Sequence, residues 1–123
     1  DCYPILVLIY SHYNFGRQSF HKDHLHPESY FTKVKRTNFK TDDEFDYYSD
    51  PLNWNSIANL QLLNGILNQS KQDEPLKTWV IKNNVDLKDH LIPEGIDLDV
   101  SNFRTFIELR RKLLRTRLKK IAT

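Results

Sequence analysis

The sequence predicts an α+β fold that is mostly helical, and three observations support this. The final segment repeats apolar residues at helical spacing with basic residues on the other side, which is typical of an amphipathic helix. Residues 19–25 and 59–63 are each compatible with a short strand. Proline and capping residues mark further helix starts. We therefore expect two strands with helices added around them.

The length and composition describe one domain with a modest core. A chain of 123 residues is long enough for a single domain. We expect one domain over residues 1–123, cut from a longer protein, because the chain begins with Asp1 and an apolar run follows almost at once. The single cysteine, Cys2, excludes an internal disulfide and a cysteine-based zinc site. We expect a soluble protein in the cytoplasm.

The formal net charge of +2 conceals an uneven distribution. Residues 101–123 contain eight Lys or Arg side chains against one acid, Glu108, which is a balance of +7. The remaining hundred residues carry ten basic and fifteen acidic side chains, which is a balance of −5. A basic segment on an acidic body suits contact with phosphate groups. It equally suits a solvated helix face that offsets the acidic body.

Residues 3–10 are the first element, and two interpretations of them stay open. They are apolar and β-branched enough for a buried strand, yet Pro4 before a compact apolar run also suits the start of a helix. The run is too short to span a bilayer and lacks the basic flank and cleavage site of a signal peptide. We therefore expect no membrane contact. Residues 11–17 are expected to form a loop.

Residues 19–25 are expected to form a strand or an extended arm with Asp23 and His24 at its end. Adjacent residues of a regular strand point to opposite faces. These two side chains therefore cannot both face one metal ion unless the strand bends.

Residues 30–58 form a long excursion between the two strands, and it holds an acidic cluster. We expect a short helix over 42–49, entered by Thr41 or Asp42 as its N-cap. The simplest interpretation of the cluster is a capped, solvated helix start. A second metal site, a regulatory surface and a partner surface are the alternatives. The acids are Asp42, Asp43, Glu44, Asp46 and Asp50.

The second half of the chain continues with a strand and two helix starts. Residues 59–63 are expected to form the second strand, and Asn64 is a suitable N-cap for a helix through about Lys71. Pro75, which follows two acids, marks another helix start. That helix would carry an apolar face formed by Leu76, Trp79 and Val80.

The C-terminal helix follows an irregular stretch over residues 84–100, where Pro93 and Gly95 interrupt regular structure. Its apolar residues fall near helical spacing, and the arginines and lysines are expected on the other side. The apolar face would consist of Phe103, Phe106, Ile107, Leu113, Leu114, Leu118 and Ile121.

Three short stretches combine the groups needed for phosphodiester chemistry. Residues 23–29 read Asp-His-Leu-His-Pro-Glu-Ser, so that an acid directly precedes a histidine. A carboxylate is a hard ligand suited to Mg²⁺ or Mn²⁺, and an imidazole can take a proton near neutral pH. Asn59 and Asn68 stand nine positions apart, and Lys71 follows. These residues supply an orienting amide, a further oxygen ligand and a cation, as metal-assisted hydrolysis requires.

These stretches resemble the HNH, or His-Me finger, nucleases, whose active site is a small ββα-metal unit. Residues 23–29 are similar to the first motif of that family, and residues 59–63 to its second strand with the middle asparagine. Residues 68–71, Asn-Gln-Ser-Lys, are similar to its short helix, with asparagine in place of the last histidine. The nine-residue step and the Asn-x-x-Lys ending also resemble the HNH domain of the CRISPR effector nuclease. Residues 3–80 most resemble the C-terminal nuclease domain of GmrSD-type bacterial restriction proteins.

The resemblance implies both a fold and an activity. It implies a ββα-metal core over about residues 19–72, a helical extension over about residues 75–123 and a helix at residues 3–10. The strand would bend at the acid–histidine pair. The activity would be a metal-dependent endonuclease that cuts DNA in restriction or defence in the bacterial cytoplasm, with RNA as a further candidate substrate. The partner would be an N-terminal ParB-like domain of the same protein.

The resemblance also implies a role for each site residue. His24 would be the general base, and Asp23 with Asn68 would hold one Mg²⁺ or Mn²⁺ ion rather than zinc. Asn59 would hold the loop and orient the base without touching the metal. Lys71 would contact phosphate or be a solvated helix end. On the C-terminal helix, the candidates for nucleic-acid contact are Arg104, Arg111 and Arg115.

Other interpretations of the same residues stay open. A non-catalytic module that binds nucleic acid or protein could keep the scaffold, although it would be expected to lose Asp23, His24 or Asn68. His21, His24 and His26 could instead form a transition-metal site of three imidazoles. His90, distant in sequence, is expected to be structural.

Overall fold

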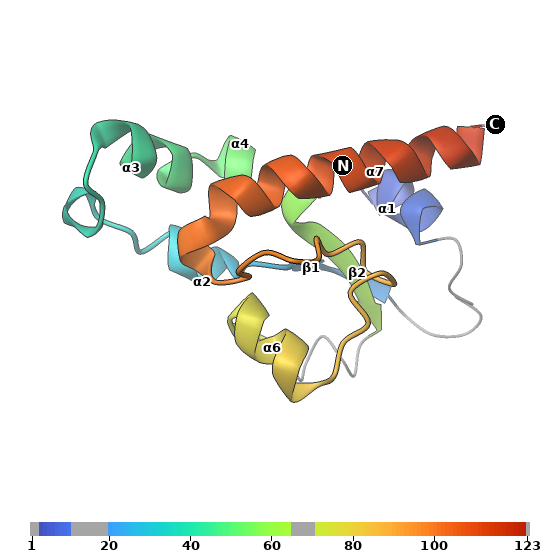
Figure 1. Ribbon diagram of the computed structural model, residues 1–123. Helices are drawn as coiled ribbons and strands as arrows, with labels where there is room; N and C mark the ends of the chain where they lie inside the picture. Colours follow the sequence, from blue (N-terminus) through green and yellow to red (C-terminus); the bar gives the residue numbers. More distant parts are fainter. Residues whose placement is uncertain (1–2, 11–19, 65–70, 123) are drawn as a thin grey trace.

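The computed structural model describes residues 3–10, 20–64 and 71–122 (Figure 1). The fold is mixed α+β and mostly helical, with one two-stranded sheet among the described residues, as predicted. The long helix α7 (Phe103–Ala122) runs above the sheet in the view of Figure 1, and α6 (Leu76–Lys82) lies below it.

The two strands come from distant parts of the sequence and pair antiparallel. They are β1 (Phe20–His24) and β2 (Leu60–Asn64). Asp23 lies opposite Gln61, and His24 lies opposite Leu60. The second strand was expected at residues 59–63 and begins one residue later. The reason is that Asn59 ends a 3-10 turn, η2 (Ile57–Asn59), which leads into β2.

Several short helices precede β2. They include α1 (Tyr3–Ile9), so the helical interpretation of this stretch is confirmed. The helix α3 (Asp42–Ser49) begins as predicted, because the Thr41 side chain accepts a hydrogen bond from the Glu44 backbone N–H. Asp50 caps the next helix in the same way. The remaining elements before η2 are α2 (Glu28–Phe31), η1 (Arg36–Asn38) and α4 (Pro51–Trp54).

The second half of the chain also follows the local signals. The helix α6 starts directly after Pro75, and residues 83–99 contain no helix or strand. Gly95 adopts a φ of +76°, which suits a residue without a side chain. A last 3-10 turn, η3 (Val100–Asn102), leads into α7. The helix expected from Asn64 to Lys71 lies largely outside the described residues.

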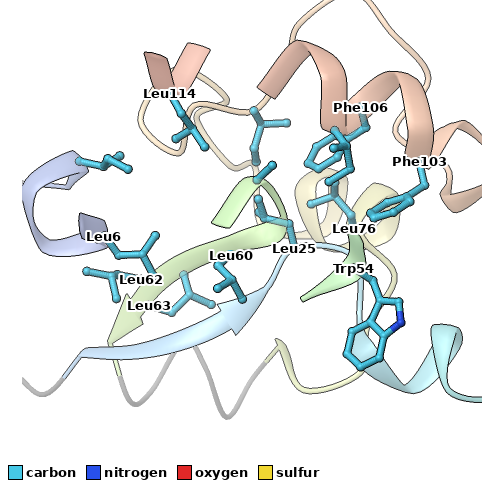
Figure 2. Close-up of a cluster of buried hydrophobic side chains, with 14 of the residues drawn as sticks. Leu6, Leu25, Trp54, Leu60, Leu62, Leu63, Leu76, Phe103, Phe106 and Leu114 are labelled. Atoms are coloured by element: carbon cyan, nitrogen blue, oxygen red, sulfur yellow. The ribbon is translucent and has the colours of Figure 1, made fainter. Parts of the chain in front are cut away.

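The core joins the sheet to two helices. Figure 2 shows Leu6 of α1 beside Leu60, Leu62 and Leu63 of β2, with side chains of α7 nearby. All of these residues are at most 5% exposed. Burial of this kind stabilises the fold by roughly 1.5–3 kcal/mol for each large apolar side chain. These buried side chains therefore pack β2 against α1, with α7 beside both.

The buried face of α7 includes one residue that was expected on the basic side. Arg110 was expected on the basic side, but it is fully buried between the apolar side chains of this face. Its guanidinium donates hydrogen bonds to the carbonyls of Ala58 and Leu60, at 3.0 and 2.6 Å, and to the Tyr10 hydroxyl at 3.1 Å. Three further bonds go to the carbonyls of Ile57, His90 and Leu91. A buried cation needs such partners, and sequence periodicity cannot reveal them.

The predicted apolar end of α7 is less buried than expected. Leu113 and Leu118 are half-buried, and Ile121 is 39% exposed. Among the described residues, no helix has both the length and the apolar character needed to cross a bilayer.

Candidate functional site

The centre of the candidate site is the buried amide of Asn59. Its Oδ1 accepts a hydrogen bond from the backbone N–H of His26 at 2.9 Å. Its Nδ2 donates to the carbonyl of His26 at 2.9 Å and to that of Trp54 at 2.8 Å. One side chain therefore fixes the loop that follows β1 and the end of α4 at the same time.

Asn59 is itself held on both sides. Its carbonyl accepts a hydrogen bond from the Leu25 N–H at 2.8 Å, which continues the pairing of the strands by one step. Arg110 holds the carbonyls of the residues before and after it, Ala58 and Leu60. The loop-holding part of the role expected for Asn59 agrees with this geometry. Its amide does not contact the His24 ring, so it orients that residue only through the backbone.

His24 ends β1 and is half-buried. Its Nε2 lies 2.9 Å from the Oδ1 of Asn55, directly after α4, and its ring centroid lies 6.1 Å from that of Trp54. Sequence analysis missed Asn55, and no motif marked it. The contact joins residues 31 positions apart, and it exists only because the excursion between the strands folds back on β1.

Asp23 faces a different set of partners from His24. Gln61, its cross-strand neighbour, donates from Nε2 to Asp23 Oδ2 at 3.0 Å. Lys71 Nζ lies 3.2 Å from the same oxygen. The strand stays regular through His24, and the chain turns only after it. The bend expected at the acid–histidine pair is therefore not seen at that pair, and the two side chains follow the alternation of a strand.

Lys71 is buried, so the interpretation of it as a solvated helix end is wrong. Its ammonium pairs with Asp23, donates to the His24 carbonyl at 2.8 Å and lies 5.6 Å from the centre of the Trp79 ring. Burial lowers the pKa of Lys71, and the charge of Asp23 opposes this shift. The side chain ties the end of β1 to the segment that precedes α6.

Asn68, the second expected metal ligand, lies outside the described residues. The donor chemistry of Asp23 still suits a divalent ion. Among the described residues, the two partners of its carboxylate both contact Oδ2. One carboxylate, one amide oxygen and waters form a hard donor set of the kind that Mg²⁺ accepts. Of the two expected ligands the structure describes only Asp23, and the Mg²⁺ or Mn²⁺ ion stays a prediction.

The alternative of three imidazoles around one metal is wrong. His21 is exposed, His24 contacts Asn55, and His26 is buried with its ring edge-on to Phe106 at 4.6 Å. The described part of the chain contains no group of three histidine, cysteine or acidic side chains that could hold a metal ion. His90 packs against Trp79 and Tyr10, as expected of a structural residue.

His26 is buried in the loop that follows the acid–histidine pair. Burial, reinforced by the charge of Lys71, lowers the pKa of His26 from 6.5 to about 3. Its Nε2 has no hydrogen-bond partner among the described residues. The side chain therefore packs as a neutral ring, while its backbone carries the contacts to Asn59.

The acidic cluster is a capped helix start, which was the simplest interpretation of it. Asp42 pairs with Arg36, and Asp43 pairs with Arg104 of α7 at 2.9 Å. The Arg104 guanidinium also lies 4.5 Å from the centre of the Tyr47 ring. Of the three arginines expected to contact nucleic acid, Arg104 is thus engaged within the protein. The other two differ in exposure, because Arg111 is half-buried and Arg115 is exposed.

The described residues define a class of domain. It is a small α+β domain in which a buried asparagine fixes the loop after an acid–histidine pair at a strand end. No protein-family model, curated protein or solved structure that was compared with the chain matches it.

Proposed function

We propose that this chain is a metal-dependent nuclease domain that hydrolyses phosphodiester bonds in DNA. The observation that carries the proposal is the Asn59 amide, which bonds to both backbone groups of His26 and so fixes the loop behind Asp23 and His24. The resemblance to the His-Me finger nucleases leads to this expectation for the middle asparagine. A ββα-metal core completed by Asn68 is part of the proposal.

His24 is the proposed general base. It is half-buried at the end of β1, so that its ring can meet solvent while its backbone is fixed by Lys71 and by the pairing with β2. An imidazole that takes a proton from water contributes about 10²–10⁴-fold to such a reaction. Because the Asp23 and His24 side chains lie on opposite faces of β1, the phosphate would have to bind across the strand end for the base to act on water beside it.

Asp23 and Asn68 would hold the metal ion, which supplies Lewis-acid stabilisation of the charge on phosphate and leaving oxygen. Gln61 and Lys71 hold Oδ2 of Asp23, and this fixes the direction of the carboxylate. The buried ammonium of Lys71 also offsets the charge of Asp23 in a site that is only 10% exposed at that side chain. In this proposal Lys71 orients the acid and the strand end.

The basic surface of α7 is the proposed contact to the DNA backbone. Arg115 and Lys112 are exposed on this helix, while Arg104 is paired with Asp43. Contacts of this kind follow the phosphates and carry no sequence information. Restriction of foreign DNA and a ParB-like partner domain in a bacterial cytoplasm rest on the resemblance alone.

The test is cleavage of supercoiled plasmid by the purified chain in Mg²⁺, in Mn²⁺ and in EDTA. The proposal predicts nicked and linear DNA with either metal and none in EDTA. Cleavage that persists in EDTA would contradict a metal-dependent mechanism. An RNA of similar length in the same buffers distinguishes the two nucleic acids as substrates. Binding of DNA without cleavage, by a folded chain in either metal, would favour the non-catalytic binding module.

A further inference from the structure

We propose that Asn55 is a positioning residue for His24, which fixes the ring of the base and selects the nitrogen that accepts the proton. The inference rests on the proposed function, since it assigns a role within the same site. It moves the task of orienting the base ring from Asn59, where the resemblance led us to expect it, to a residue of the excursion between the strands.

The contact itself determines the tautomer of His24. The distance between His24 Nε2 and Asn55 Oδ1 is 2.9 Å, which is a normal hydrogen bond. With the Asn55 amide oriented as in the structure, its oxygen can only accept, and this orientation places the proton on Nε2. The lone pair of the neutral ring is then on Nδ1. The nitrogen that faces away from Asn55 is the one that can take a proton from water.

The position of Asn55 is fixed by its own backbone and by Asn59. Asn55 ends α4, and its N–H donates to the Pro51 carbonyl at 2.9 Å. The carbonyl of the preceding residue, Trp54, accepts from Asn59 Nδ2 at 2.8 Å. The same amide holds His26, two residues after His24. Asn59 therefore fixes both segments that carry the His24–Asn55 pair. The hydrogen bond to Asn55 then fixes the orientation of the His24 ring.

The simpler alternative is that Asn55 only ends a helix. It is exposed, and asparagine is a common turn residue. Asn83 offers a matched control, because it ends α6 with nearly the same backbone angles. Asn55 has φ −100° and ψ 12°, and Asn83 has φ −104° and ψ 6°. The Asn83 side chain also donates to the Trp79 carbonyl at 3.0 Å, so a role only in ending the helix predicts at least as large a loss of stability for alanine at position 83 as at position 55.

The experiment has a spectroscopic arm and a kinetic arm. Ring ¹⁵N–¹H correlation spectra of His24 at pH 8 report which nitrogen is protonated. We expect the Nε2–H form in the wild type and in Asn83→Ala, and a mixture of both tautomers in Asn55→Ala. Asn55→Asp, which keeps the acceptor, should retain the Nε2–H form. In plasmid cleavage, Asn55→Ala should lower kcat by about 10–100-fold with little change in KM, and Asn55→Asp should recover most of that loss.

Each outcome decides the assignment. An Nδ1–H ring in the wild type would overturn it, since the amide would then donate to His24 rather than accept. Identical His24 spectra of the wild type and Asn55→Ala would overturn it as well. If Asn55→Ala does not fold, the wild type and Asn55→Asp still give the tautomer. A chain that cuts no DNA but shows the expected spectra refutes the nuclease and leaves the pairing of Asn55 with His24 in place.

Discussion

Replacement of His26 by phenylalanine should make the protein markedly more resistant to acid. The ring of His26 is 1% exposed and lies edge-on to Phe103 and Phe106. Phenylalanine keeps the ring and leaves the backbone bonds to Asn59 intact. It also removes the Nε2 atom that has no hydrogen-bond partner among the described residues, so we expect stability at neutral pH to change little.

The magnitude follows from the shift of the pKa of His26 from 6.5 to about 3. Because the folded pKa is the lower one, the unfolded chain binds more protons between these values, and stability falls as the pH falls. The stability that the neutral, buried His26 ring contributes is fully present above pH 6.5 and is lost progressively toward pH 3. The complete loss corresponds to about 5 kcal/mol, and at pH 4.5 it is about 3 kcal/mol.

Urea unfolding at pH 7.5 and at pH 4.5, followed by tryptophan fluorescence, measures this difference. The free energy of unfolding of the wild type should fall by about 3 kcal/mol more than that of His26→Phe between the two pH values. His21→Phe, at an exposed position of β1, is the matched control and should fall as the wild type does. An equal fall in the wild type and His26→Phe would refute the reasoning, because it would mean that the buried ring is not held neutral.

Three further predictions concern the framework and the basic helix. Asn59→Ala leaves three buried backbone groups without partners and should lower the free energy of unfolding by about 3–5 kcal/mol in urea titrations. A loss below about 1 kcal/mol would contradict the role of Asn59 in fixing the two segments that it joins. Arg110→Met should cost about 2–5 kcal/mol in the same assay, whereas Arg115→Met on the exposed face should stay within about 0.5 kcal/mol. If α7 binds DNA, replacing Arg111 and Arg115 by glutamine should flatten the salt dependence of log K by about 2, and a smaller change is expected for Arg104, which pairs within the protein. An unchanged salt slope would mean that α7 has only a structural role and does not contact the DNA backbone.

The elements set by local signals were the predictable ones. Thr41 caps α3 because its side chain reaches a backbone N–H three residues away, and such contacts depend on neighbouring residues alone. Pro75 marks the start of α6 for the same reason. The apolar spacing of α7 follows from helix geometry. The predicted start of β2 was one residue too early, since the strand boundary depends on the 3-10 turn that precedes the strand.

The site was predictable only where its residues form a short motif. Asp23 and His24 were proposed from the acid–histidine motif and Asn59 from its nine-residue step to Asn68, and in the structure Asn59 contacts the loop that follows Asp23 and His24. The burial of Lys71 and the partner of His24 could not be predicted, because both depend on residues that are distant in sequence. Arg110 is the clearest case, since its acceptors lie 19 to 100 positions away.

The rate of plasmid cleavage by His24→Ala, compared with His21→Ala, tests the central claim most directly. Both variants remove an imidazole from β1, but only one of them removes the proposed base. In Mg²⁺, His21→Ala should cut at close to the wild-type rate, and His24→Ala should be slower by about 100-fold or more. Cleavage by His24→Ala at the wild-type rate would contradict the assignment of His24 as the base, provided that EDTA abolishes cleavage in the same preparation.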